Sequence, residues 1–217
     1  QHSVHNPLSQ YRKSYSIDEV LAAPAITYPL TLPMCAPISD GAAAVLVCNE
    51  DGLKKLGTDK TRAIKLLATV VRSATTRPAD RADLHCEHLA AKEAYEIAGV
   101  GPNDIDVAEV HDATAMGELI HVENLGLVGF GESGPAAERG DFSIGGRVPV
   151  NTSGGLESKG HPIGATGLAQ IHELVCQLRG EAGQRQVAGA TTAIHENSGG
   201  IRGIEEAAVA INIFQKN

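Results

Sequence analysis

From residue 60 onward, apolar runs of strand length alternate with stretches of helical periodicity. The runs at 64–72, 105–111, 186–194 and 206–214 are short and rich in small or β-branched residues, as is typical of strands. The stretches at 80–99, 115–125 and 168–178 repeat apolar residues at the spacing of one helix face. This order predicts an α/β fold, in which a mixed sheet is covered by helices on both faces. A glycine-rich loop with a short helix is expected within 126–146, and a polar turn at 195–203.

The first 59 residues carry weaker signals and are predicted to form a segment distinct from residues 60–217. Residues 1–33 read as irregular chain broken by prolines, with Ser16 capping a short helix. The apolar run 42–48 predicts a strand buried on both faces, and residues 50–56 predict a short helix that ends at Gly57. The chain does not begin with Met, and its opening reads as the middle of a longer polypeptide.

Charge and hydropathy exclude two classes of partner. The formal net charge is −8 and no basic stripe is present, so nucleic acid is not an expected partner. No apolar window is long enough to span a membrane, and no signal peptide is visible. The four cysteines lie far apart without a CxxC pair, which predicts reduced thiols. The last residues, FQKN, are not a peroxisomal signal, so a cytoplasmic location is the expectation.

The stretch 151–170, NTSGGLESKGHPIGATGLAQ, combines features that suit catalysis. Gly154 and Gly155 predict a turn in which the backbone can take positive φ and approach a ligand closely. His161 follows on a loop that the next residue, Pro162, stiffens. Small residues then open a helix, which leaves N–H groups and the positive end of the helix dipole facing the loop. A histidine held in this way is a candidate general base.

A second histidine cluster carries a weaker signal. His85, Cys86, Glu87 and His88 have the composition of a metal site, and the two histidines share a helix face. A solvated face of an amphipathic helix gives the same pattern. A structural metal site usually needs four converging ligands, and the sequence shows no second cluster nearby. We therefore predict no metal site.

The stretch 151–170 closely resembles the glycine-histidine-proline signature of the thiolase superfamily. Three other segments support the resemblance. SDGAAAVLV at 39–47 is similar to the last strand of the N-terminal half of a thiolase. VHDATAMGELI at 110–120 resembles the HDCF loop of the sterol-carrier-protein-2-like branch, and HENSGG at 195–200 lies where relatives carry a CxG or HN-type turn. The resemblance implies a layered αβαβα fold, with residues 1–59 as loop and tail of the N-terminal half and 60–217 as the C-terminal half.

The resemblance also implies an activity: an acyltransferase that makes or cleaves carbon–carbon bonds in acyl-coenzyme A thioesters. His161 would activate a cysteine supplied by the N-terminal half, His111 would help to form an oxyanion hole, and His195 would act in the same pocket. Orienting or oxyanion-stabilising roles fall to Asp112, Asn197 and Gly200. Contacts to the coenzyme A substrate fall to Ser158, Gly160, Gly164 and Ala165. No covalently bound cofactor is implied, and a homo- or hetero-dimer of thiolase folds is expected.

Two departures from the family pattern leave alternatives open. All four cysteines lie outside the nucleophile's context, and each is expected to be a small buried hydrophobe: Cys35, Cys48, Cys86 and Cys176. Ala113 replaces the cysteine of the HDCF loop, so His195 or His111 would have to transfer protons, while Glu196 is expected to orient a neighbour or to be exposed. Related proteins without the second cysteine include retro-aldolases that act on hydroxyacyl-coenzyme A, such as sterol side chains, and subunits that work with an OB-fold/zinc-ribbon partner. A non-catalytic subunit of a complex is the third alternative.

Overall fold

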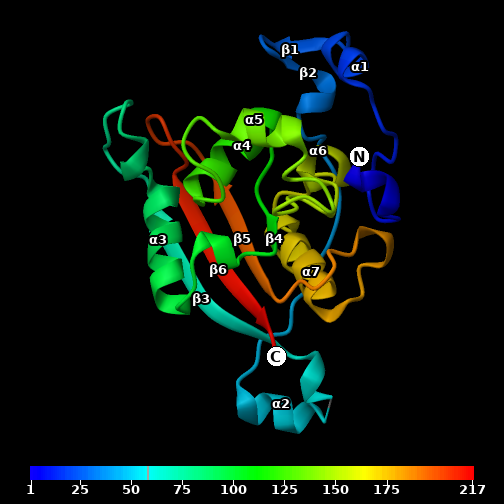
Figure 1. Cartoon of the computed structure of the whole chain (residues 1–217), viewed down its shortest axis with the longest axis vertical. Coiled ribbons are helices and arrows are strands. Elements are labelled where there is room, and N and C mark those ends of the chain that lie inside the picture. Colours follow the sequence, from blue (N-terminus) through cyan, green and yellow to red (C-terminus); the bar gives the residue numbers. More distant parts are fainter. Residues whose placement is uncertain (58) are drawn as a thin grey trace.

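A four-stranded mixed sheet forms the centre of the molecule in the computed structural model, which describes residues 1–57 and 59–217 (Figure 1). The strands are β3 (Ile64–Ser73), β4 (Val107–Glu109), β5 (Thr192–Gly199) and β6 (Ala208–Lys216), in the order β3-β6-β5-β4. β4 and β5 are parallel, whereas β6 is antiparallel to both β5 and β3. In this register Glu109 pairs with His195, and His195 pairs with Asn212.

Helices cover both faces of this sheet, as the sequence predicts. α3 (Cys86–Ala98) contacts β3 and β6, and α7 (Thr166–Arg179) contacts β4 and β5 on the opposite face (Figure 1). Because successive side chains of a strand point to opposite faces, the sheet has a hydrophobic core on each side. Ile194 packs in the core under α3, and Ala193 packs with Leu174 and Leu178 of α7 in the other core. Full burial of each of these leucines contributes about 1.5–3 kcal/mol.

Three further helices lie at the end of the sheet where β4 stops (Figure 1). α4 (Ala115–Asn124) begins directly after the loop that follows β4, and Thr114 caps it by accepting a hydrogen bond from the Gly117 amide. α5 (Ser133–Arg139) lies in the predicted glycine-rich segment, and α6 (Gly155–Lys159) precedes the loop of His161. Single turns of 3₁₀ helix occur at His2–His5, Leu32–Met34, Lys60–Arg62, Ala82–Leu84, Pro102–Asp104 and Gly183–Arg185.

The first part of the chain forms small elements around the sheet. α1 (Ile17–Leu21) begins at Ser16, whose hydroxyl accepts a hydrogen bond from the Glu19 amide in a reciprocal capping box. A hairpin of β1 (Ala25–Thr27) and β2 (Leu30–Thr31) follows. α2 (Glu50–Leu56) ends at Gly57 in the left-handed conformation. The predicted cap at Ser16 and the predicted stop at Gly57 are therefore both confirmed.

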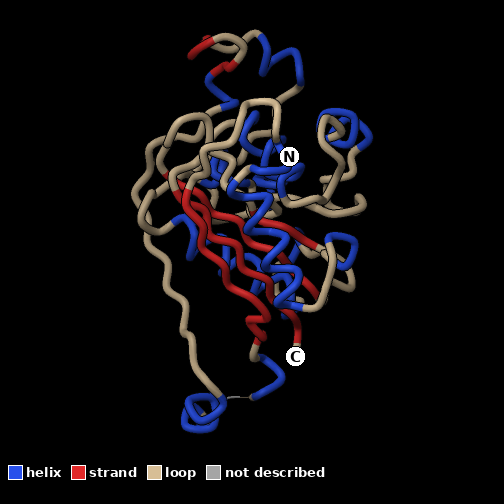
Figure 2. The backbone as a smooth tube through the Cα atoms, turned by 90° about the vertical axis from the view of Figure 1, so that its left-hand side faces the viewer, coloured by secondary structure: helices blue, strands red, loops and turns tan. Residues whose placement is uncertain are grey.

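The predicted strand at 42–48 is wrong. This segment is an exposed, irregular chain that runs down one side of the molecule into α2 (Figure 2). Leu46 is 72% exposed and Val47 is 78% exposed. A strand requires a neighbour for its backbone N–H and C=O groups, and no described strand lies beside this segment. An apolar composition alone therefore did not produce a strand here.

Further boundaries differ from the prediction: β4 and β6 both begin two residues later than expected, and β5 and α3 differ more. β5 begins at Thr192 and continues to Gly199, so His195 lies inside a strand and not in a turn. Buried polar residues at the end of β5 interrupt its apolar pattern, which is why the sequence places the strand too early. The helix predicted from residue 80 begins only at Cys86, after the 3₁₀ turn, and it ends at Gly99 as expected. None of the described helices is long and apolar enough to cross a membrane.

Candidate active site

His161 lies on the loop between α6 and α7, and its neighbours fix its tautomer. The Thr166 hydroxyl donates its single proton to the Pro162 carbonyl at 3.0 Å, so it accepts a hydrogen bond from Nδ1–H of His161 at 2.7 Å. Nε2 of His161 therefore carries the free lone pair. The His161 amide donates to Oγ of Ser39 at 3.3 Å, and a Cβ on Gly160, whose φ is +109°, would lie 2.6 Å from the same oxygen. Glycine is thus required next to this histidine.

His111 meets His161 from the loop after β4. The two imidazoles have a centroid separation of 4.9 Å and an interplanar angle of 76°, and both rings are half-buried. Burial lowers the pKa of His111 to about 4, with a further contribution from His161 and His121. Burial, and then the Lys159 ammonium, lowers the pKa of His161. Both rings are consequently neutral at pH 7, which is the state in which an imidazole can accept a proton.

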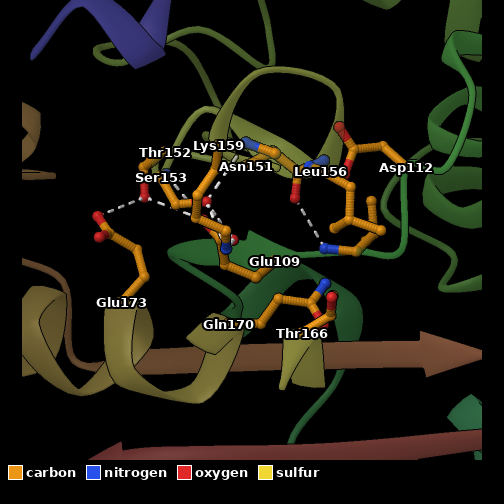
Figure 3. A network of polar contacts seen from close by, with 12 residues as sticks. Glu109, Asp112, Asn151, Thr152, Ser153, Leu156, Lys159, Thr166, Gln170 and Glu173 are labelled. Carbon is orange, nitrogen blue, oxygen red and sulfur yellow. Dashed lines mark hydrogen bonds and ion pairs between the residues drawn. The ribbon is translucent and has the colours of Figure 1, made fainter. Parts of the chain in front are cut away.

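Asp112 ties the His111 loop to α6. Its Oδ1 accepts a hydrogen bond from the Leu156 amide at 2.7 Å, and the side chain is 3% exposed (Figure 3). Burial, and then the nearby carboxylates of Glu118 and Glu157, raises the pKa of Asp112 well above its usual value. A Cβ on Gly155 would lie 2.0 Å from Oδ2 of Asp112, so only glycine fits at that position. The predicted orienting residue therefore contacts the backbone of α6.

A buried network holds the turn at the start of this motif. Glu109 accepts hydrogen bonds from the Ser153 amide at 2.9 Å and from its hydroxyl at 2.7 Å. Lys159 donates to the same hydroxyl at 3.2 Å, and Glu173 on α7 accepts from Thr152 at 3.2 Å (Figure 3). Burial raises the pKa of Glu109 to about 7 although Lys159 opposes the change. These contacts join β4 and α7 to the segment that carries His161.

His195 forms its hydrogen bonds with α7 and β6. Asn212 donates to its Nδ1 at 2.9 Å, so its Nε2–H donates to Oε1 of Gln170 at 3.2 Å, and neither ring nitrogen retains a free lone pair. Asn197 donates to the same Gln170 oxygen at 2.9 Å. His195 is 3% exposed, and burial lowers its pKa to about 3. The structure therefore gathers His195 and Asn197 against α7, whereas Gly200 lies exposed beyond the end of β5.

Glu196 contributes a contact that the sequence only hinted at. Because side chains alternate along β5, Glu196 faces away from His195 and Asn197. It is fully buried, and its Oε2 accepts a hydrogen bond from the His111 amide at 2.8 Å. Burial raises the pKa of Glu196 to about 7. Of the two roles expected from the sequence, Glu196 therefore orients a neighbour and is not exposed. The supporting side chains of Ser39, Thr166 and Gln170 had no distinguishing sequence signal.

The four residues assigned to coenzyme A do not line one hollow. Gly164 and Ala165 line an open hollow of about 410 Å³, together with Pro162 and the segment 39–43. Ser158 lines a second hollow of about 280 Å³, which also contains the acidic side chains of Asp112, Glu118 and Glu157. Gly160 is buried and lines neither of them.

No cysteine in the described residues forms a hydrogen bond with His111 or His161. Cys86 is fully buried, and burial, with nearby carboxylates, raises the pKa of its thiol to about 12, which makes it unreactive. Cys48 is exposed, so its predicted burial is wrong, because the segment before it is not a strand. Cys35 and Cys176 are half-buried, and the backbone of Cys35 pairs with Thr114 beside the His111 loop.

Comparison with known proteins places these features in a family. The chain is 45% identical over 207 residues to "Sterol carrier protein 2" of Oryctolagus cuniculus, which covers 92% of this chain and 37% of that protein. It is 41% identical over 219 residues to "Acetyl-CoA acetyltransferase" of Methanothermobacter thermautotrophicus, which covers 100% of this chain and 55% of that protein.

Solved structures give the same fold. The "Ltp2-ChsH2(DUF35) aldolase" matches with a TM-score of 0.77 at 20% identity, over 99% of this chain and 55% of that one. The chain thus spans between about a third and just over half of the length of these relatives. Residues 70–212 match the family described as "Thiolase C-terminal domain-like". The chain therefore belongs to the thiolase superfamily.

Proposed function

We propose that the protein containing this chain is a thiolase-like acyltransferase that acts on acyl-coenzyme A thioesters. The observation that carries the proposal is the contact between two neutral imidazoles, of which His161 presents an unprotonated Nε2. In this role Nε2 takes the proton of a cysteine thiol, and the thiolate attacks the thioester carbonyl carbon. The bond between the carbonyl carbon and the coenzyme A sulfur then breaks, and His161 gives its proton to that sulfur so that coenzyme A leaves as the thiol. His111 donates a hydrogen bond to the carbonyl oxygen while negative charge develops on it.

The nucleophilic cysteine is proposed to lie outside these 217 residues. We assign residues 1–59 to the end of an N-terminal half and residues 60–217 to the C-terminal half, in agreement with the share of the relatives that the chain spans. The exposed apolar segment at 42–48 supports this division, because an irregular apolar segment left in solvent is open to packing against a further part of the protein. The acyl-coenzyme A substrate is proposed to approach along the open hollow at Gly164 and Ala165. The reaction requires no covalently bound cofactor.

The test uses the full natural polypeptide and measures exchange of labelled coenzyme A into acetyl-coenzyme A. His161→Gln should lower kcat/KM by about 10²–10⁴-fold, the usual contribution of a general base. His172→Gln is the matched control, because His172 is exposed on α7 and outside the site. The burst of acyl-enzyme should fall in parallel with exchange. Unchanged exchange in His161→Gln would refute the assignment of the base.

A second candidate is a retro-aldolase that cleaves a 3-hydroxyacyl-coenzyme A, such as one bearing a sterol side chain. Ala113 at the position of the HDCF cysteine favours it, as does the fold of the Ltp2-ChsH2(DUF35) aldolase. A base would remove the hydroxyl proton, and the bond between the α and β carbons would break to give a ketone and the enolate of the acyl-coenzyme A. The α carbon would then take a proton back from the protonated base. This candidate predicts an OB-fold/zinc-ribbon partner and no acyl-enzyme.

One measurement separates the two candidate reactions, and a second tests the expected assembly. Release of a ketone from a 3-hydroxyacyl-coenzyme A without coenzyme A exchange supports the aldolase, and the opposite result supports the acyltransferase. Sedimentation velocity of the full polypeptide, alone and with its co-purified partner, tests the expected homo- or hetero-dimer. If His161→Ala leaves the activity of such a complex unchanged, the chain is a non-catalytic subunit.

A further inference from the structure

A buried group of carboxylates and imidazoles lies on the α3 side of the sheet. It consists of five residues, which we call the buried His–Glu cluster: His85, Glu87, His121, Glu196 and Glu206. They come from the N-cap and first turn of α3, from α4, from β5, and from the turn before β6. Glu87 and Glu196 are fully buried, and His121 is 3% exposed. Apart from the hydrogen bond that Glu196 accepts from the His111 amide, the proposed acyl transfer gives these residues no role.

The spacing of the polar atoms matches that of ligands on one ion. Nδ1 of His121 is hydrogen-bonded to Oε2 of Glu87 at 2.9 Å and lies 3.7 Å from Oε2 of Glu196. Asn124 also donates to Oε2 of Glu87 at 2.8 Å, so an ion at this oxygen would replace these hydrogen bonds. One ligand atom from each of these three residues lies within 4.8 Å of the others. Bonds of about 2.0–2.2 Å to an ion separate adjacent ligand atoms by roughly 3.0–3.6 Å. Both separations from Nδ1 of His121 therefore lie close to this range.

A second triad shares Glu87 with the first. His85, Glu87 and Glu206 also bring one ligand atom each within 4.8 Å of one another. Nε2 of His85 lies 3.3 Å from Oε2 of Glu206, yet the geometry is not that of a hydrogen bond. His85 and Glu206 are thus placed to complete the coordination of an ion bound at Glu87.

Unpartnered carboxylate oxygens point to the same conclusion. Oε1 of Glu87 and Oε1 of Glu196 are buried without a hydrogen bond to any described residue. With Oε2 of Glu206, the cluster holds three of the five such side-chain atoms in the described residues. Leaving buried carboxylate oxygens unpaired is strongly unfavourable, and an ion is one of the few groups that satisfies them. Three carboxylates against two imidazoles also make the cluster electronegative.

We propose that Glu87, His121 and Glu196 bind a divalent first-row transition-metal ion such as Zn²⁺ or Mn²⁺, with His85 and Glu206 as further ligands. Mixed imidazole and carboxylate ligands suit these ions. The ion crosslinks α3, α4 and β5. It also secures the His111 loop, because Oε2 of Glu196 accepts the His111 amide. Its role is structural, and it takes no part in a chemical step.

The sequence conceals this site because its ligands lie on four separate elements. The neighbouring pair of histidines in His85-Cys86-Glu87-His88 does not form a site of its own. His88 instead bonds to the Asn124 carbonyl with Nδ1 at 3.0 Å, and its ring lies against Phe130. Only His85 and Glu87 of that run belong to the cluster.

The test begins with the full natural polypeptide, stripped with a chelator and then dialysed against Zn²⁺ or Mn²⁺ alone. Inductively coupled plasma mass spectrometry should find about one ion per chain, and the ion should raise Tm by several degrees. Glu87→Gln and His121→Gln should lose both effects, whereas His172→Gln should retain them. Substoichiometric metal in the natural protein, or full binding in Glu87→Gln and His121→Gln, would overturn the proposal.

A spectroscopic test covers the case in which those variants fail to fold. Co²⁺ substituted into the natural protein should show ligand-field bands of nitrogen and oxygen coordination, without sulfur-to-cobalt charge transfer. The nearby alternative set of His85, Cys86 and Glu205 would give such charge transfer, and its appearance would refute the proposed ligands. Glu205 is already paired with Arg77 at 3.1 Å, which makes it the weaker candidate.

Discussion

Replacing Gly155 with alanine should destabilise the protein through Asp112, and a second glycine isolates the effect. Gly155 has φ of +62°, and a Cβ there would lie 2.0 Å from Oδ2 and 2.7 Å from Cγ of buried Asp112. Gly183 has φ of +61° with nothing within 4 Å of its ideal Cβ. An alanine at either position therefore has the same unfavourable left-handed backbone, but only an alanine at Gly155 also clashes with a side chain.

The structure sets the size of each effect. An alanine in the left-handed region costs about 1–2 kcal/mol at either position. Displacing a packed, buried side chain adds about 1–3 kcal/mol at Gly155 alone. The free energy of unfolding should thus fall by about 1–2 kcal/mol in Gly183→Ala and by about 2–5 kcal/mol in Gly155→Ala.

Urea unfolding followed by far-ultraviolet circular dichroism measures both losses. The double variant Gly155→Ala with Asp112→Ala should lose less than the sum of its single variants, because the clash is absent. Equal losses in Gly155→Ala and Gly183→Ala would show that Asp112 does not occupy the space next to Gly155. The same result would remove the proposed link between the His111 loop and α6.

Three further predictions follow from buried polar contacts. Arg185→Met should lower the free energy of unfolding by about 3–5 kcal/mol, because it leaves buried Glu173 without its ion-pair partner at 2.9 Å. Arg185→Lys keeps the charge and should lose less stability. Equal losses in the two variants would contradict this reasoning. Asn151 has φ of +52°, which glycine adopts without strain and alanine does not. Asn151→Gly should therefore lose only the stability that the side-chain hydrogen bonds supply. In urea unfolding, the free energy of unfolding of Asn151→Ala should be about 1–2 kcal/mol lower than that of Asn151→Gly. In a nuclear magnetic resonance titration, the His161 imidazole should lose its proton below pH 6.5 as pH rises. Lys159→Met should shift the pKa of His161 upward, because it removes a nearby positive charge. A downward shift would refute the contribution of Lys159.

Signals confined to a few neighbouring residues were predictable from the sequence. The cap at Ser16 and the left-handed stops at Gly57 and Gly99 depend on local backbone chemistry, and all three occur where expected. The strand predicted at 42–48 failed because pairing depends on a neighbour that sequence cannot supply. A sequence pattern therefore fixes the tendency of a segment, while its partner decides whether a strand forms.

The candidate site shows the same limit. His111 and His161 stood out through the thiolase resemblance, but nothing in their spacing of fifty residues predicts ring centroids 4.9 Å apart. Glu196 was hard to assign because its burial depends on β5 extending past His195. Once that strand is in place, alternation alone sends Glu196 to the side opposite its two neighbours.

β5 helps to explain how the imidazoles of His111 and His161 are held next to each other. On one face of the strand, His195 and Asn197 both bond to Gln170, one turn after Thr166, which holds Nδ1 of His161. On the other face, Glu196 holds the amide of His111. β5 therefore holds His111 directly from one face and reaches His161 from the other face only through α7, and the strand's period of two makes the arrangement possible. A slip of β5 by one residue would exchange the faces and release both anchors, so the register of β5 with β4 and β6 is a structural requirement of the site.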